Sequence, residues 1–243
     1  GREGGFVAVQ NAGFTLHQGE SLGIVGESGS GKSTLARSLV GLVKPARGTL
    51  RFDGKPAQPT GAGRVAYLRD MQLIYQHPYE ALSPRLTVSA AIAEPLQRHG
   101  LCAKAEVPAR VRDLMGQVEL SEDLANRLPG QLSGGQCQRV AIARALAFDP
   151  RVLIADEVTS ALDVTLQAQV LDLLLRLQRD RGLTMIFISH DLAIIRRLCN
   201  SVLVMRRGEI VEAGATRDVF DNPREHYTRA LLEAIPRLDR GAA

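Results

Sequence analysis

One stretch of the sequence combines glycines, a lysine and hydroxyl side chains at the spacing of a phosphate-binding loop. It reads Gly26, Glu27, Ser28, Gly29, Ser30, Gly31, Lys32, Ser33 and Thr34. Glycines let backbone N–H groups surround an anion, and a helix starting here adds positive potential. We expect Lys32 to reach the β- and γ-phosphates of a nucleotide and the Ser33 hydroxyl to ligate Mg²⁺. The alternative, a glycine-rich turn without a ligand, is disfavoured by the apolar strand before the loop and the helix after it.

Two carboxylates, Asp156 and Glu157, follow the apolar run Val152–Ala155. In a parallel α/β sheet, ligands bind at the edge where the strands end. We expect Asp156 to hold Mg²⁺, directly or through water, and Glu157 to act as the general base that polarises the attacking water. Taken alone, an apolar strand ending in Asp-Glu is more often a solvated strand end. The phosphate loop in the same chain favours the functional interpretation.

A second glycine motif follows roughly a hundred residues after the first. It reads Leu132, Ser133, Gly134, Gly135 and Gln136. Ser133 can cap a helix over Cys137–Ala147, and the two glycines leave N–H groups accessible to an anion. A simple loop-to-helix cap would also explain serine and glycine here. Considered with the first loop, the motif predicts a place where a second nucleotide docks.

The elements that must position these residues alternate between strands and helices. Predicted strands are Glu20–Val25, Thr49–Phe52, Met71–Tyr75, Val152–Ala155, Thr184–Ser189, Val202–Met205 and Ile210–Val211, the last two joined by a turn at Arg207-Gly208. Predicted helices are Lys32–Leu42, Val164–Arg181 closed by Gly182, Leu192–Leu198, and two short helices within Thr216–Ile235. This alternation predicts a mainly parallel sheet. Helical spacing between Thr87 and Leu132 predicts an inserted helical subdomain.

Composition restricts the class of protein. The 243 residues carry a net charge of +4 from 30 basic and 26 acidic side chains, and aromatic residues make up only 4%. The basic residues are scattered and tryptophan is absent, so we expect no nucleic-acid partner. No apolar run is long enough to cross a bilayer, and no signal peptide is predicted. Cys102, Cys137 and Cys199 are isolated, which disfavours disulfides and a zinc site and fits a reducing cytosol.

With these motifs in order, the chain resembles the ATPase subunit of an ABC transporter along essentially its whole length. Gln76 in Ile74–Pro78 resembles the family's Q-loop glutamine, which ligates Mg²⁺ and senses the membrane partner. Asp163 in Ser160–Asp163 resembles the D-loop, which links two active sites. His190 in Ile188–Leu192 resembles the switch histidine that contacts the γ-phosphate. The resemblance implies an α/β fold, with a RecA-like P-loop NTPase core, an antiparallel β part and the inserted helical subdomain.

The resemblance also implies partners. Two ATPase subunits pair head to tail and bury ATP between the phosphate loop of one and Ser133–Gln136 of the other. Two transmembrane permease subunits and an extracytoplasmic solute-binding protein complete such a transporter, and the ATPase lies at the cytoplasmic face of the cell membrane. The surface near Gln76–Arg85 and the helical subdomain is expected to receive a short permease helix.

Several strings narrow the resemblance to importers of oligopeptides, dipeptides and nickel. They are Gly23–Ser33, Gly134–Arg139, Ser160–Val164, Asn222-Pro223 and Tyr227–Leu232. In this subclass the second ATPase is more often a paralogue than a copy of the same chain. Solute choice resides in the binding protein and permease. A nickel or other-solute importer, an exporter or lipoprotein-release ATPase, a non-transport ABC ATPase and a regulatory half without turnover remain alternatives.

The chain departs from the family pattern in places. Val158 stands where the family has proline, and a β-branched residue suits a strand end, so catalysis should survive. The adenine-stacking aromatic lies upstream in the family, in a first strand that this chain does not clearly include, and Phe6 is a weak candidate for it. The cysteine-rich tail of some relatives is absent. Because the chain begins at Gly1 and its first strand is not recognisable, a shortened chain and one half of a tandem ATPase both stay open.

We therefore predict one ABC ATPase domain in three parts. The catalytic core covers residues 1–83 and 133–211, the helical subdomain 84–132, and a C-terminal appendage 212–243. The expected reaction is hydrolysis of ATP, with Mg²⁺, to ADP and phosphate in support of solute import, with peptides as the favoured solute. Glu157, His190 and Gln76 are the expected catalytic residues, and Ser33, Gln76 and Asp156 the expected metal ligands.

Overall fold

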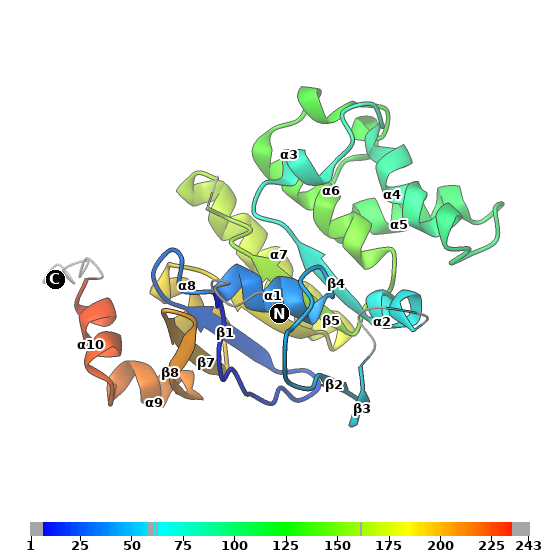
Figure 1. Ribbon diagram of the computed structural model, residues 1–243. Coiled ribbons are helices and arrows are strands. Elements are labelled where there is room, and N and C mark those ends of the chain that lie inside the picture. Colours follow the sequence, from blue (N-terminus) through cyan, green and yellow to red (C-terminus); the bar gives the residue numbers. More distant parts are fainter. Residues whose placement is uncertain (1–6, 58–60, 62, 161, 235–243) are drawn as a thin grey trace, which may run out of the picture.

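A six-stranded sheet forms the centre of the protein in the computed structural model, which describes residues 7–57, 61, 63–160 and 162–234 (Figure 1). In spatial order the strands are β4 (Met71–Ile74), β5 (Val152–Asp156), β6 (Thr184–Ile188), β1 (Ser21–Val25), β7 (Ser201–Arg206) and β8 (Glu209–Ala215). The first five are parallel, and β8 pairs antiparallel with β7 through the predicted turn at Arg207-Gly208. The predicted mainly parallel sheet is confirmed.

Helices cover both faces of the sheet because successive strand residues point to opposite sides. Ile24, Ile154 and Ile188 belong to the apolar cluster that also contains residues of α1 (Lys32–Leu39) and α2 (Arg64–Asp70). Val25 and Phe187 belong to the other cluster, with residues of α7 (Val164–Arg181) and α8 (Leu192–Leu198). Strands buried on both faces read as continuous apolar runs, as the central strands do here.

A group of helices extends beyond the β4 side of the sheet (Figure 1). It contains α3 (Pro78–Ala81), α4 (Val88–Arg98), α5 (Val107–Gln117) and α6 (Gly134–Leu146), with short 3₁₀ helices η1 (Glu122–Leu124) and η2 (Pro129–Gln131). Ile92, Leu96 and Leu114 are fully buried here and lie in the same apolar cluster as Phe187 of the sheet. The predicted boundary at residue 132 therefore divides elements that share one core.

Some predicted boundaries were wrong by a few residues. The helix predicted over Lys32–Leu42 ends at Leu39, because the chain turns through Gly41 at φ 67°. Val158 was expected at a strand end, but β5 stops at Asp156 and Val158 lies buried in the following turn. Gly182 caps α7 in the left-handed conformation, at φ 62°, as predicted.

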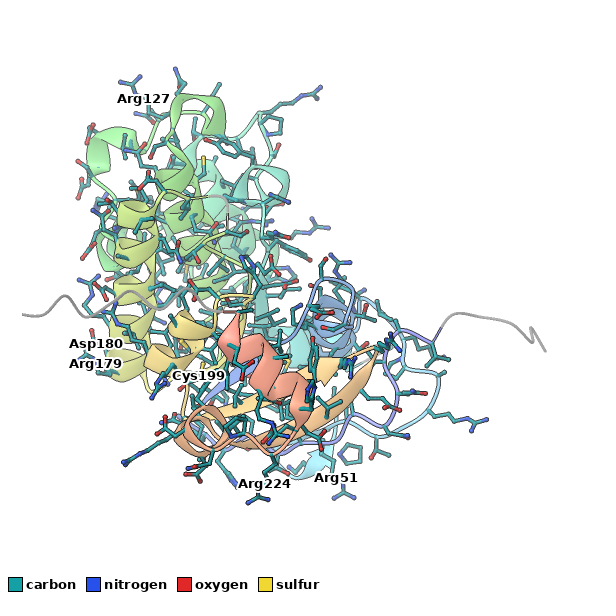
Figure 2. The ribbon with its side chains drawn as sticks, turned by 90° about the vertical axis from the view of Figure 1, so that its left-hand side faces the viewer. Arg51, Arg127, Arg179, Asp180, Cys199 and Arg224 are labelled. Atoms are coloured by element: carbon teal, nitrogen blue, oxygen red, sulfur yellow. The ribbon has the colours of Figure 1, made fainter. Side chains whose placement is uncertain are left out.

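The remaining elements are a small β ribbon, at the bottom of the view in Figure 1, and two C-terminal helices on the β8 side of the sheet. A two-stranded antiparallel ribbon joins β2 (Arg51–Phe52) to β3 (Lys55–Pro56), and the chain ends in α9 (Thr216–Asp221) and α10 (His226–Glu233). Figure 2 places Arg127 of the helical group and Arg224, just before α10, at opposite ends of the molecule. The predicted pair of C-terminal helices is confirmed.

The three cysteines are free, and Cys137 and Cys199 are buried whereas Cys102, between α4 and α5, is half-buried. Burial raises the pKa of both the Cys137 and the Cys199 thiol. Cys137 is fully buried within α6. Every helix within the described residues is too short or too polar to span a lipid bilayer.

Candidate functional site

The predicted phosphate loop links β1 to α1 in the order strand, loop, helix. Gly26 and Gly31 have φ values of 145° and 105°. A β-carbon at Gly26 would lie 2.1 Å from the Met205 carbonyl oxygen, and one at Gly31 would lie 2.6 Å from the Ala8 carbonyl oxygen. Both positions therefore require glycine because backbone from elsewhere in the chain passes directly against the loop.

Lys32 is buried at the first turn of α1, with only 5% of its surface exposed. Its Nζ donates to the carbonyl oxygens of Gly26 and Glu27, at 2.8 and 2.9 Å. Burial lowers the pKa of Lys32, while the carboxylates of Glu157 and Asp156 act in the opposite direction. The ammonium is thus held over the loop, where phosphate oxygens would replace carbonyl oxygens as its acceptors.

Ser30 gives an independent sign that the loop fits a polar ligand. Its hydroxyl is buried and has no hydrogen-bond partner among the described residues. A buried hydroxyl without a partner carries a desolvation penalty, which a ligand oxygen can relieve. Together with the buried Lys32 and the glycine backbone, this hydroxyl makes the loop suitable for the phosphates of a nucleotide.

The predicted metal ligands Ser33 and Asp156 lie side by side. The Ser33 hydroxyl donates to Asp156 Oδ1 at 3.0 Å, and Asp156 is only 5% exposed. Burial raises the pKa of Asp156, the hydrogen bond from Ser33 opposes this effect, and the charge of Glu157 adds to it. Mg²⁺ prefers oxygen ligands and is often held by one or two carboxylates together with substrate phosphates. These two oxygens beside the phosphate loop fit that ion.

The predicted catalytic residues meet around one carboxylate oxygen. Gln76 Nε2 donates to Glu157 Oε2 at 3.0 Å, and His190 Nδ1 lies 3.6 Å from the same oxygen. Gln76 also donates to the Ser160 hydroxyl at 3.1 Å. Glu157 adopts φ 49°, and its N–H donates to the Ile188 carbonyl oxygen at 2.9 Å. Left-handed backbone at a non-glycine residue is strained, and such strain clusters at functional sites.

A small polar cleft opens beside this group. It is lined by Glu157, Thr159, Ser160, Gln167, Ser189, His190, Asp191 and Ile194. The carboxylate therefore faces a space that water can enter, as a general base requires. Sequence reasoning missed Thr159 and Gln167, because neither belongs to a motif that the spacing singled out.

The second glycine motif forms the start of α6. The Ser133 hydroxyl accepts from the Gln136 N–H at 3.3 Å, and Gln136 Oε1 accepts from the Ser133 N–H at 2.9 Å, which is a capping box. A β-carbon at Gly134 would lie 3.2 Å from the Leu162 side chain, and one at Gly135 would lie 3.2 Å from the Leu166 side chain. Asp163, predicted to belong to the nucleotide site, caps α7 by accepting from the Leu166 N–H at 2.9 Å.

Tyr227 is a contact of the phosphate loop that motif spacing did not reveal. Its hydroxyl accepts from the Glu27 N–H at 3.0 Å, although the two residues are 200 positions apart. In the sequence, Tyr227 stands out only as part of the C-terminal string Tyr227–Leu232. Phe6, the proposed adenine-stacking residue, and Ala161 of the proposed D-loop lie outside the described residues.

Two family models match the chain. The model described as ABC transporter matches residues 9–160, and the one described as oligopeptide/dipeptide transporter, C-terminal region, matches residues 211–243. Among curated proteins, the glutathione import ATP-binding protein GsiA of Pectobacterium atrosepticum is 49% identical over 96% of this chain. GsiA of Escherichia coli K12 is also 49% identical, over 94%. The chain spans only 37% of the length of each of these relatives.

Solved structures give the same fold. The cbiO1 protein of Clostridium perfringens, described as part of the ABC transporter complex cbiONQ, superposes with a TM-score of 0.80 at 29% identity, covering 95% of this chain and 90% of its own. The dimeric ATP-binding cassette MJ0796, in a post-hydrolysis state bound to ADP and Pi, superposes with a TM-score of 0.77 at 33% identity, covering 86% and 91%. The predicted α/β fold with a small antiparallel part is confirmed.

Proposed function

Because this chain belongs to the ABC transporter family, we propose that it binds ATP and hydrolyses it to ADP and phosphate to power solute import. The observation that carries the proposal is the meeting of three groups at one sheet edge. They are the buried Lys32 over the phosphate loop, the Ser33–Asp156 pair, and Glu157 with Gln76 and His190.

Each residue has a role in this reaction. The loop from Gly26 to Thr34 cradles the phosphates, with Lys32 moving from backbone carbonyls to the β- and γ-phosphates. Ser33, Asp156 and Gln76 hold Mg²⁺, which when bound offsets charge on the transferring phosphoryl group. Glu157 accepts a proton from the attacking water, and His190 positions the γ-phosphate.

A second ATPase subunit completes the site in this proposal. Ser133 to Gln136 at the start of α6 would face the phosphate loop of the opposite subunit, and Asp163 would link the two sites. The dimeric ATP-binding cassette with ADP and Pi supports such pairing. We propose that the partner is a paralogue.

The membrane partner would bind the helical side of the molecule. A groove between β4, α3 and α6 is lined by Tyr75, Leu82, Arg144 and neighbouring residues. Tyr79, on the same helix α3 as the groove residue Ala81, is 49% exposed, and its hydroxyl donates to the Leu132 carbonyl oxygen at 3.0 Å. A short permease helix in this groove would lie close to Tyr79, whose hydroxyl is hydrogen-bonded to Leu132, the residue before Ser133. This arrangement would connect the permease to the second glycine motif.

We propose that the transporter is a peptide importer at the cytoplasmic face of the cell membrane, with two permease subunits and an extracytoplasmic binding protein. The C-terminal family match and the similarity to glutathione import proteins support this class, and the tripeptide glutathione is the first solute to test. We propose that the chain is divided into three parts. They are a catalytic core of residues 1–83 and 133–211, a helical subdomain of residues 84–132 and a C-terminal appendage of residues 212–243. A nickel importer of the same family is the second candidate.

Affinity capture tests the proposal. The Glu157→Gln variant, with ATP, is used to recover partners from solubilised membranes, and wild type with ADP serves as the control. We expect mass spectrometry to identify two multi-span permeases, a second ATPase and a binding protein. Recovery of only soluble nucleic-acid-binding proteins would overturn the transport function and leave ATP hydrolysis to be tested by phosphate release.

A further inference from the structure

We propose that Tyr227, on α10, is a positioning residue that sets the geometry of the phosphate loop before ATP arrives. The inference rests on the proposed function, because it assigns to the C-terminal segment a part in ATP binding. Its basis is the hydrogen bond in which the Glu27 N–H donates to the Tyr227 hydroxyl at 3.0 Å. Tyr227 touches the loop backbone, not the reacting atoms.

The bond acts on Lys32 through a single peptide unit. The N–H of Glu27 and the carbonyl of Gly26 belong to the same planar peptide, in which they point in opposite directions. Tyr227 holds the N–H from one side, and Lys32 Nζ donates to the carbonyl oxygen from the other side, at 2.8 Å. Fixing one end of this unit therefore fixes the direction of the other, and with it the resting position of the lysine ammonium.

The C-terminal segment itself is firmly anchored. Tyr227 is 7% exposed, and the Arg206 guanidinium lies 4.8 Å from the centre of its ring. The buried carboxylate of Glu212 accepts from the N–H groups of Arg224 and Glu225, at 2.8 and 3.2 Å, immediately before α10. A tyrosine held on both sides can impose a position on a glycine-rich loop that would otherwise sample many conformations.

Other contacts from the same end of the chain support this arrangement. The Gly208 N–H donates to the Ser30 carbonyl oxygen at 2.9 Å, and the Met205 carbonyl oxygen closes the space behind Gly26. Strand β7 and the β7–β8 turn thus pack against one side of the phosphate loop, and Tyr227 of α10 adds a further contact. Strands β7 and β8 and helix α10 lie near one another at the β8 side of the sheet (Figure 1).

Tyr227→Phe in the full chain tests the inference, because it removes one hydroxyl and keeps the ring beneath Arg206. We expect the dissociation constant of a fluorescent ATP analogue to rise about fivefold, equivalent to about 1 kcal/mol, the usual net value of one hydrogen bond. The turnover number at saturating ATP should change by less than about twofold, because Glu157 and His190 are not touched. Amide hydrogen exchange at Glu27, measured without nucleotide, should become faster.

Tyr67→Phe is the matched control. Tyr67 is similarly buried, and its hydroxyl lies 2.7 Å from the Leu39 carbonyl oxygen and 3.1 Å from Met71 Sδ, so the variant also loses the hydrogen bonding of a buried tyrosine hydroxyl. It should lose stability without changing ATP affinity or exchange at Glu27. Glu212→Gln, which weakens the anchor before α10, should shift ATP affinity in the same direction as Tyr227→Phe by a smaller factor.

The outcomes separate the two proposals. Unchanged ATP affinity and unchanged Glu27 exchange in Tyr227→Phe would overturn the positioning role while ATP binding stands. An equal loss of affinity in Tyr227→Phe and Tyr67→Phe would also overturn it, because general destabilisation would then explain both. If wild type binds no ATP, the proposed function fails, and exchange at Glu27 still decides whether Tyr227 holds the loop.

Discussion

The two glycine-rich motifs both open a helix, yet their surroundings differ. The phosphate loop is enclosed by Met205, Gly208 and Tyr227, and it holds the buried Lys32 and a buried Ser30 hydroxyl that has no hydrogen-bond partner in the part of the chain that the structure describes. The start of α6 satisfies its own polar groups through Ser133 and Gln136, and Ser133 is exposed. The first is prepared for a ligand by its own chain, whereas the second presents an outward surface that suits contact with another molecule.

The largest expected effect concerns the base beside the phosphate loop. Glu157→Gln should lower the turnover number about 10²- to 10⁴-fold, because a carboxamide cannot accept the proton of water. ATP binding should be kept, and a closed dimer should accumulate. Phosphate release and size-exclusion chromatography measure the two effects, with the exposed Glu122→Gln as the control. An unchanged rate would remove the general-base assignment.

Lys32→Ala tests whether the first motif alone holds ATP. Removing the phosphate's charged partner should weaken ATP binding about 10- to 100-fold, the range for a hydrogen bond to a charged group. Lys104→Ala, between α4 and α5, should bind normally. Full affinity of Lys32→Ala for a fluorescent ATP analogue would contradict the role of the loop.

Ser133→Ala examines the other motif. Loss of the cap should lower the free energy of unfolding by about 1 kcal/mol. It should also reduce turnover while leaving the ATP affinity of the isolated subunit unchanged. Thr87→Ala is a matched control, since Thr87 caps α4 by accepting from the Ala90 N–H at 3.3 Å. It should give a similar loss of stability with normal turnover. Equal turnover in the two variants would contradict a role of the second motif in catalysis.

The smallest expected effect is a pH-dependent change in stability at Asp156. Burial raises the pKa of this carboxyl, so the native state binds its proton more tightly than the unfolded state and loses stability as pH rises through the native pKa. Asp156→Asn should therefore be more stable than wild type at pH 7, on the order of 1 kcal/mol. Urea unfolding should show the difference disappearing below the ordinary carboxyl pKa. A variant less stable at pH 7 would contradict this account.

Sequence spacing singled out most of the residues around the phosphate loop, because they stand in short strings that can be recognised without knowing the fold. Gly26 to Ser33 and Asp156-Glu157 are short strings at strand ends, and parallel strands bring such ends together. The exact end of α1 depended on the turn at Gly41, and α2 carried no clear pattern and was not predicted. The bond between Glu27 and Tyr227 joins residues 200 positions apart, so only the folded chain reveals it.

Asp163 shows a second limit of sequence reasoning. The resemblance of its string to the family's D-loop implied a link between two active sites, and within one subunit the structure shows Asp163 as a helix cap. Such a residue can serve both purposes, because capping uses one carboxylate oxygen, Oδ1, and leaves the other available. Roles that require a second subunit therefore cannot be read from the contacts of one chain.

The unequal burial of the three cysteines has a practical consequence for observing this protein at work. Cys137 and Cys199 are buried thiols with raised pKa values, whereas Cys102 lies half-buried between α4 and α5. Because thiolates are the reactive species, a maleimide dye should label Cys102 selectively in the unmodified chain. A second dye attached near α10 would then report, by energy transfer, how the helical group moves relative to the opposite end of the molecule.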